Sequence, residues 1–208
     1  MTLRRGLSAV AGAAMTLPLL ASQASGGEYV FGSWMPASDH FNRVSLTRAF
    51  AEIARETNND VTWKLVPGGQ LADGTSTYQA VQDGLMHGGL AISTYVPNLV
   101  PSLNTIYSTI VFSDDVVAST GAALEVFTLQ CPSCLDEFRK LNLVALGGWT
   151  GSPYYLACRE PIRTVNDLKG KRIRGTGGLV RFIKELGAVP VAATLMEAVG
   201  LLQRGGLD

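Results

Sequence analysis

The sequence predicts an α/β protein whose strands run parallel and whose helices cover the sheets. Three short apolar strands alternate with two amphipathic helices between residues 29 and 92, and 47% of the 208 residues are hydrophobic. Such alternation is typical of parallel strands joined by right-handed crossovers. Ligands bind beyond the carboxyl ends of such strands, so the loops 32–40, 67–74 and 93–101 are candidate binding loops.

The elements of this first part follow from the spacing of apolar residues. Short apolar runs predict strands over 29–31, 61–66 and 88–92. Apolar residues recurring every three to four positions predict helices over 41–57 and 75–85. The resulting order is strand, helix, strand, helix, strand.

In the rest of the chain, predicted strands and helices alternate less regularly. A loop over 93–103 comes first. The expected elements are a helix over 118–129, strands over 143–146 and 154–157, a short helix over 165–168, a strand over 172–174 and a helix over 179–186. Two adjacent glycines indicate a change of direction, so we place a domain junction at 147–152.

The charge balance disfavours two classes of partner. The chain has 17 basic and 17 acidic side chains, and no block of like charges. It therefore has no net field that gathers nucleic acid or an anionic membrane. We expect neither a nucleic-acid partner nor membrane insertion of the mature chain.

The N-terminus predicts a secretory signal peptide over 1–24. Arg4 and Arg5 precede an apolar stretch over 7–21, and small residues follow at 22–24. The stretch is shorter than the ~20 residues that span a bilayer. A retained membrane anchor is the alternative. Cleavage after residue 24 places the mature protein in the periplasm.

Export permits disulfides, so Cys131 and Cys134 are a disulfide candidate. Their Cys-Pro-Ser-Cys motif is either a structural clip or a redox-active dithiol, which makes a periplasmic thiol oxidoreductase an alternative function. The motif lacks the strand that leads into thioredoxin-like sites. A zinc site normally needs four protein ligands, whereas the chain has one close pair of cysteines and no clustered histidines, so we expect no metal. We also expect no cofactor.

Catalytic signals are weak. The chain has only His40 and His87 as histidines and no Gly-x-Ser-x-Gly elbow. The adjacent pair Asp114 and Asp115 is better suited to capping a helix than to acid–base catalysis, because neighbouring side chains point apart. We therefore expect no enzyme.

Several runs occur in a specific order after the first strand. They are FGSWMP at 31–36, PGGQL at 67–71, the stretch from PI at 161–162 through DLKG at 167–170 to RIR at 172–174, GAVP at 187–190 and LQRG at 202–205. In order and spacing they resemble the substrate-binding subunits of tripartite ATP-independent periplasmic (TRAP) transporters, the DctP-like proteins.

The resemblance implies a two-lobed periplasmic binding fold (type II-like), with the first lobe over 25–148 and the first part of the second lobe over 149–208. The chain stops at 206–208, inside a motif that continues in similar proteins, so we expect an incomplete second lobe. The implied function is capture of an organic acid and its delivery to TRAP membrane subunits. A ligand-binding protein for a sensor or another importer is an alternative.

The resemblance implies that Arg174 holds the carboxylate of the solute, although Arg172 replaces the usual lysine. A guanidinium group also matches a carboxylate bidentately and stays charged. Glycines 175, 177 and 178 let the backbone approach a ligand. The competing role is a surface salt bridge, which suits Arg172 better.

Some acid-binding relatives carry a second arginine where this chain has Tyr154. A single arginine favours a monocarboxylate, or a ligand with hydroxyl and apolar parts. Further candidate ligand contacts lie in the loops beyond the strands and at the junction. They are Trp34, His40, Gln70, Tyr95 and Trp149, for each of which ordinary packing or solvation is the alternative.

Overall fold

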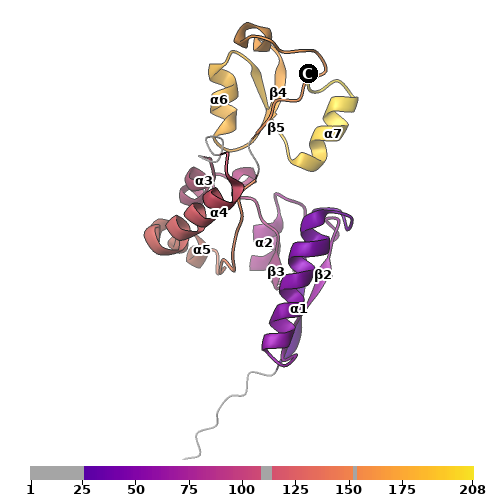
Figure 1. Cartoon of the computed structure of the whole chain (residues 1–208), viewed down its shortest axis with the longest axis vertical. Coiled ribbons are helices and arrows are strands. Elements are labelled where there is room, and N and C mark those ends of the chain that lie inside the picture. The colour runs from indigo at the N-terminus through magenta and orange to yellow at the C-terminus, as the bar shows by residue number, and fades with distance from the viewer. Residues whose placement is uncertain (1–25, 109–113, 152–153) are drawn as a thin grey trace, which may run out of the picture.

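A computed structural model describes residues 26–108, 114–151 and 154–208, and the predicted signal peptide over 1–24 lies outside these ranges. The described chain forms two α/β bodies that follow one another along the long axis of the molecule (Figure 1). We call the body around strands β1, β2 and β3 the first lobe, and the body around β4 and β5 the second lobe. The predicted α/β class is confirmed.

The sheet of the first lobe has three parallel strands in the order β2-β1-β3. They are β1 (Gly27–Gly32), β2 (Val61–Val66) and β3 (Gly88–Gly89). The parallel arrangement confirms the expected topology. β3 is shorter than the predicted 88–92, because only its two glycines pair with β1. A Cβ on Gly88 would lie 2.9 Å from the Phe31 ring, so glycine is needed for this close approach.

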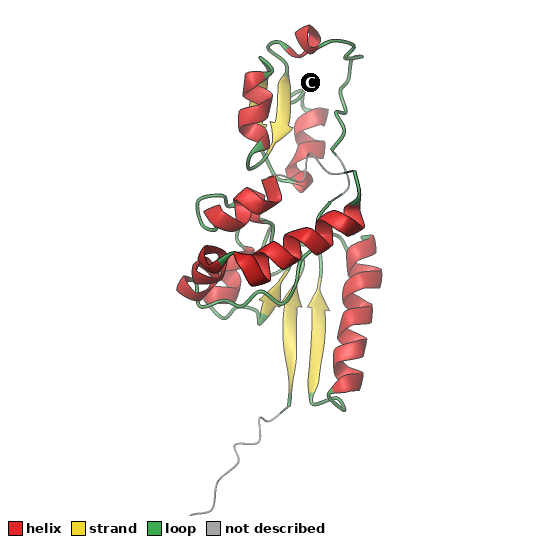
Figure 2. Ribbon diagram, turned by 60° about the vertical axis from the view of Figure 1, so that its left-hand side comes forward, coloured by secondary structure: helices red, strands yellow, loops and turns green. Residues whose placement is uncertain are grey.

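The two helices of the first crossovers also match the predicted elements. A π-helical turn η1 (Phe41–Leu46) runs into α1 (Thr47–Glu56), and α2 (Thr77–Gln82) follows β2. α1 ends because Asn58 and Asn59 take positive φ angles of 50° and 64°. α1 packs against β2 and runs beside the sheet (Figure 2).

A layer of helices completes the first lobe (Figure 2). It contains a short turn η2 (Ser93–Tyr95), α3 (Pro101–Ser108), α4 (Val116–Glu125), its π-helical continuation η4 (Val126–Gln130) and α5 (Pro132–Lys140). The predicted helix over 118–129 is confirmed, whereas α3 and α5 were not predicted. As expected for a cap, the carboxylate of Asp115 accepts hydrogen bonds from the N–H groups of Val117 and Ala118 at 2.9 Å.

Two predicted strands are wrong. Residues 143–146 and 154–157 pair with no strand within the described part of the chain. Leu143 and Ala145 instead pack on the helical layer, and Val144 between them is 82% exposed. The alternation of partly buried and exposed residues over 143–146 resembles that of a strand, but here it arises because one side of an extended segment packs on helices.

The second lobe is a parallel pair of strands with helices beside it (Figure 1). In chain order it comprises η5 (Val165–Leu168), β4 (Arg172–Gly175), α6 (Leu179–Glu185), β5 (Val189–Ala192) and α7 (Leu195–Gln203). η5, β4 and α6 confirm the short helix predicted over 165–168, the strand over 172–174 and the helix over 179–186. A small core of Leu168, Ile183 and Ala188 joins the strands to α6.

The first lobe has two larger clusters of buried side chains. One lies between the sheet and α1 and contains Phe31, Trp34, Leu46 and Leu90. The other joins α2 to the helical layer and contains Tyr78, Val100, Leu103, Phe127 and Cys134. Among the residues that the structure describes, no helix has both the length and the apolar character to cross a membrane.

The substitution Leu90→Ala tests the first cluster. Leu90 is 3% exposed and packs with Trp34 and Phe31, so we expect its truncation to lower the free energy of unfolding by about 2–5 kcal/mol. Urea unfolding followed by circular dichroism measures this loss. Leu129→Ala is the matched control, because Leu129 is 78% exposed. Equal losses in the two variants would show that Leu90 is not part of a packed core.

Candidate functional site

The two lobes meet where β3 and β4 end. Tyr95 lies just beyond β3 in the first lobe, and Arg174 lies in β4 of the second. The Arg174 Nη2 group donates to the Tyr95 hydroxyl at 3.4 Å, and its Cζ atom lies 5.9 Å from the centre of the Tyr95 ring. Arg174 Nε donates to the carbonyl oxygen of Ala193 at 2.8 Å. The guanidinium group is therefore oriented within the second lobe and faces the first.

A second set of contacts links α3 to the segment after β4. Ser108 Oγ accepts from the Gly178 N–H at 3.2 Å, and the hydroxyl of Thr176 donates to that of Thr94 at 3.4 Å. A pocket of about 10 Å³ between the lobes is lined by Thr94, Tyr107, Ser108, Tyr154, Thr176, Gly178 and Leu179. It holds one water molecule at most, so in this conformation the lobes leave no room there for an organic acid.

Glycines after β4 allow this close approach between the lobes. Gly177 has a φ of 54°, and a Cβ there would lie 2.7 Å from Asn104 Oδ1. A Cβ on Gly178 would lie 2.9 Å from the Ser108 Cβ. In this structure the glycines therefore bring the backbone against the other lobe, where the sequence predicted an approach to a ligand.

An aromatic wall supports Tyr95 from its own lobe. The Trp34 ring lies 5.8 Å from the Tyr95 ring, and Gly74 is so close that a Cβ there would lie 2.9 Å from that ring. Trp34 is 4% exposed, so it reaches the site through Tyr95. Its buried indole Nε1 has no hydrogen-bond partner among the described residues.

The other candidate residues lie around this centre at different depths. Trp149 is half-buried and its ring lies 4.4 Å from the Phe41 ring. Tyr154 is exposed and lines the small pocket between the lobes. His40 and Gln70 are exposed to solvent. The structure thus brings Arg174, Tyr95 and Trp34 into contact, although they come from three separate segments of the sequence.

The Leu195 N–H also donates to the Tyr95 hydroxyl at 3.0 Å. The sequence reasoning missed Thr94, Ser108, Thr176 and the backbone of Ala193 and Leu195. Ser108 was missed because the start of α3 was predicted as loop and no element was predicted over 104–108. Pro101 at the first position of α3 is a helix signal that would have indicated it.

The two arginines of β4 have different partners. Arg172 forms a bidentate ion pair with Asp208, with Nε–Oδ2 and Nη2–Oδ1 distances of 3.0 and 2.8 Å. Hydrogen bonding and charge raise the pKa of Arg172 and lower that of Asp208. Among the described residues, no carboxylate lies within ion-pair distance of Arg174. The internal salt bridge therefore belongs to Arg172, as the sequence suggested.

The loop after β2 is held in place by one carboxylate. Asp73 Oδ1 accepts from the backbone N–H and the hydroxyl of both Thr75 and Ser76, at 2.7–2.8 Å. The hydroxyl of Thr75, followed by the groups of Ser76, lowers the Asp73 pKa from 3.8 to about 2. This turn fixes Gly74 against the Tyr95 ring.

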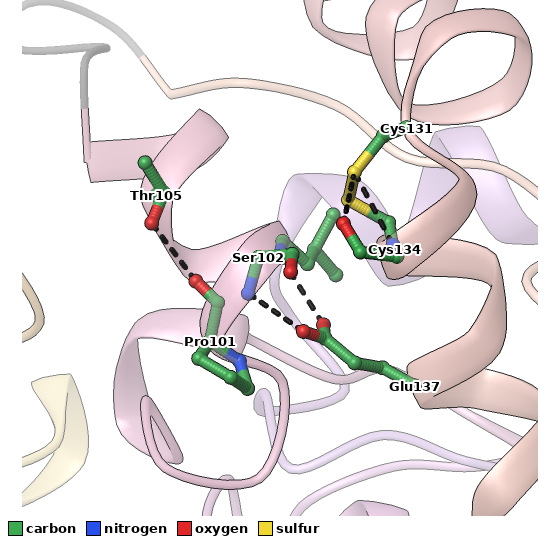
Figure 3. The surroundings of a disulfide bond; sticks show 8 residues. Pro101, Ser102, Thr105, Cys131, Cys134 and Glu137 are labelled. Carbon is green, nitrogen blue, oxygen red and sulfur yellow. Dashed lines mark hydrogen bonds between the residues drawn. A yellow bond between two sulfur atoms is a disulfide. The ribbon is translucent and has the colours of Figure 1, made fainter.

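The predicted Cys131–Cys134 disulfide is confirmed and lies at the start of α5 (Figure 3). Cys134 is fully buried, and Cys131 Sγ accepts from the Cys134 N–H at 3.2 Å. One turn further along α5, Glu137 accepts from the N–H groups of Ser102 and Leu103 at the start of α3 (Figure 3). The disulfide thus fixes the helix that caps α3, and α3 carries Ser108 to the other lobe.

The described residues contain no cluster of three or more His, Cys, Asp or Glu side chains placed to hold a metal ion. The described residues around Arg174 offer hydrogen-bond donors next to one cation. These donors are the Arg174 guanidinium, the hydroxyls of the threonines, Ser108 and Tyr95, and backbone N–H groups.

Two α/β lobes face one another across a cation near the strand ends, an arrangement typical of two-lobed binding folds. The sequence model of the family "Bacterial extracellular solute-binding protein, family 7" (DctP) matches residues 35–208. The chain therefore belongs to this family, which confirms the resemblance and the two-lobed fold class.

Solved structures of TRAP periplasmic solute-binding proteins have the same fold. One from Bordetella bronchiseptica, with bound mandelate, is 24% identical with a TM-score of 0.76 over 88% of this chain. One from a marine metagenome, specific for aromatic acids and bound to 3-hydroxybenzoate, is 20% identical with a TM-score of 0.77 over 89%. One from Pseudomonas putida F1, with bound D-glucuronate, is 24% identical with a TM-score of 0.73 over 87%. This chain spans 57% to 59% of their lengths.

Replacing both paired cysteines tests the disulfide as a structural clip. We expect Cys131→Ala/Cys134→Ala to lower the free energy of unfolding by about 2 kcal/mol, because the closed loop is short. Urea unfolding measures the change. A reducing agent should destabilise the wild type and leave the double variant unaffected. A wild type that is insensitive to reductant would contradict the clip.

The Asp73 turn predicts a pH dependence. Because the folded protein lowers the pKa of Asp73, its ionised form favours folding, and this contribution is present above the ordinary value of 3.8 and lost as the pH falls through about 2. The difference in unfolding free energy between wild type and Asp73→Asn should therefore grow between these pH values and then stay constant. Urea unfolding at several pH values measures it.

Asp114→Asn is the charge-matched control for this experiment, because it removes one carboxylate from an exposed position. A difference between wild type and Asp73→Asn that does not change with pH would show that the turn does not depend on the Asp73 charge.

Proposed function

We propose that this protein captures an organic acid between its lobes, in the periplasm, and delivers it to the membrane subunits of a TRAP transporter. The observation that carries the proposal is Arg174. It is a permanent cation, lies where the lobes meet, and has only neutral hydrogen-bond partners among the described residues. The family to which the chain belongs is one of solute-binding proteins, which supports a non-catalytic role.

A carboxylate suits this position for a physical reason. A hydrogen bond between a guanidinium group and a carboxylate is charge-assisted and about twice as strong as one with a neutral acceptor. The Ala193 carbonyl oxygen holds Nε, so the orientation of the guanidinium group is fixed before a ligand arrives. A carboxylate therefore forms a stronger hydrogen bond with Arg174 than the two neutral oxygen atoms that now accept from it.

The surroundings of Arg174 favour a monocarboxylate with an apolar or hydroxylated body. Tyr154 stands where some acid-binding relatives carry a second arginine, and it lines the space between the lobes. Tyr95 adds an aromatic ring next to Arg174, and the buried Trp34 ring packs beside it. The aromatic acids bound to the Bordetella and marine proteins are consistent with such a ligand.

We further propose that the first lobe covers 25–148 and that the second begins at 149. Trp149 and Tyr154 then lie at the crossing between the lobes, where a hinge or a ligand contact is expected. His40 and Gln70 stay candidate ligand contacts, because both lie in loops beyond the carboxyl ends of β1 and β2.

The substitution Arg174→Ala tests the carboxylate anchor. Removing one partner of a charge-assisted pair costs about 2–5 kcal/mol, so we expect affinity for the bound acid to fall at least about thirtyfold. A thermal-shift screen against organic acids, followed by calorimetry with each acid that binds, measures this loss. Arg181→Ala is the control, because it removes an exposed arginine of α6. Undiminished binding by Arg174→Ala would disprove the anchor.

A further inference from the structure

The two halves of the Cys131–Cys134 disulfide differ in their access to solvent. Cys134 is fully buried, whereas Cys131 is partly exposed at the point where η4 ends and α5 begins. An external thiolate breaks a disulfide by attacking one of its two sulfur atoms, so access decides which sulfur it reaches. A thiolate that arrives from solvent therefore attacks Cys131.

The start of α5 stabilises negative charge on the Cys131 sulfur. Cys131 is the N-cap residue of α5, and its Sγ accepts from the Cys134 N–H at 3.2 Å (Figure 3). The Ser133 hydroxyl lies 3.4 Å from the same sulfur. The N–H groups in the first turn of a helix carry partial positive charge, which favours an anion there. A thiolate released at Cys131 is therefore stabilised where it forms, and this favours the reduced pair.

Contacts other than the disulfide also hold α5 in the first lobe. The Phe138 ring lies 6.0 Å from the Tyr78 ring and 5.6 Å from the Phe127 ring. Glu137 accepts from the Ser102 N–H at 2.8 Å. These contacts remain when the S–S bond breaks, and a disulfide that closes so short a loop contributes modestly to stability. Reduction therefore weakens the fold and leaves α5 in place.

We propose that Cys131 and Cys134 form a redox-active pair that exchanges electrons with an external dithiol while the protein stays folded. A thiolate of the dithiol attacks Cys131 Sγ, the S–S bond breaks, and the Cys134 sulfur leaves and takes up a proton. The second sulfur of the dithiol then loses its proton and attacks the first, which releases Cys131 as a thiolate. Two electrons pass to the pair, and the dithiol becomes a disulfide. The proposal does not depend on solute capture at Arg174.

Reduction of the folded full chain tests the proposal. The chain carries Cys158→Ser, so that the pair supplies its remaining sulfhydryl groups. We expect dithiothreitol at pH 7 to reduce the pair at the same rate with and without a urea concentration too low to change the circular dichroism, because exchange needs no unfolding. Alkylation with iodoacetamide and mass spectrometry measure the reduced fraction. A reduction rate that rises with urea in step with unfolding would overturn the proposal.

Cys134→Ala and Cys131→Ala, each in the Cys158→Ser chain, form a matched pair that compares the two thiols. In Cys134→Ala the Cys131 sulfur keeps its access and its place at the helix start. We therefore expect iodoacetamide at pH 7 to modify it at least about tenfold faster than it modifies Cys134 in Cys131→Ala. Full unfolding in urea should make the two rates equal, which assigns the difference to the fold.

Peptide mass spectrometry of the reduced, briefly alkylated chain gives the same comparison without either substitution. Faster modification of Cys131 than of Cys134 is the expected result there as well. Equal modification of both cysteines in the folded chain would show that Cys131 is not the sulfur that exchanges.

Discussion

The site depends on the hydrogen bonds that Arg174 donates to two neutral oxygen atoms. Two residues away in the same strand, Arg172 has a carboxylate partner and forms a bidentate ion pair with Asp208. Arg174 is instead held by a backbone carbonyl and a phenol. A carboxylate partner would have to be removed before a ligand acid could bind, at a cost of several kcal/mol if buried. Neutral partners orient the charge and leave it available.

The approach of the lobes depends on a chain of supports that starts far from Arg174. The disulfide at Cys131 fixes the start of α5, Glu137 of α5 caps α3, and Ser108 at the end of α3 accepts from the backbone of the second lobe. The first step is a covalent bond, and the other two are hydrogen bonds between segments 35 and 70 residues apart. Glycine at 178 is what lets the final step occur, because a side chain there would collide with Ser108.

Local pattern predicted much of the fold and little of the geometry of the site. The alternation of apolar Val61, Trp63 and Leu65 with Thr62 and Lys64 predicted β2 with the bounds that the structure has. The same signal failed at 143–146, where packing on helices produced the alternation. Arg174 was found as a cation in a motif, but its contact with Tyr95 spans 79 residues and depends on how the lobes meet. Spacing along the chain carries no information about such a contact.

The contacts between the lobes are individually weak, and this weakness fits a binding protein that must open. The bonds from Arg174, Leu195, Thr176 and Gly178 all end on hydroxyl oxygens of the first lobe. Each such bond contributes a net of about 1 kcal/mol, because water replaces the partner when the lobes part. A few bonds of this size hold a closed state without trapping it. Each of these bonds is weaker than a charge-assisted bond between Arg174 and a carboxylate would be, which agrees with the proposed function.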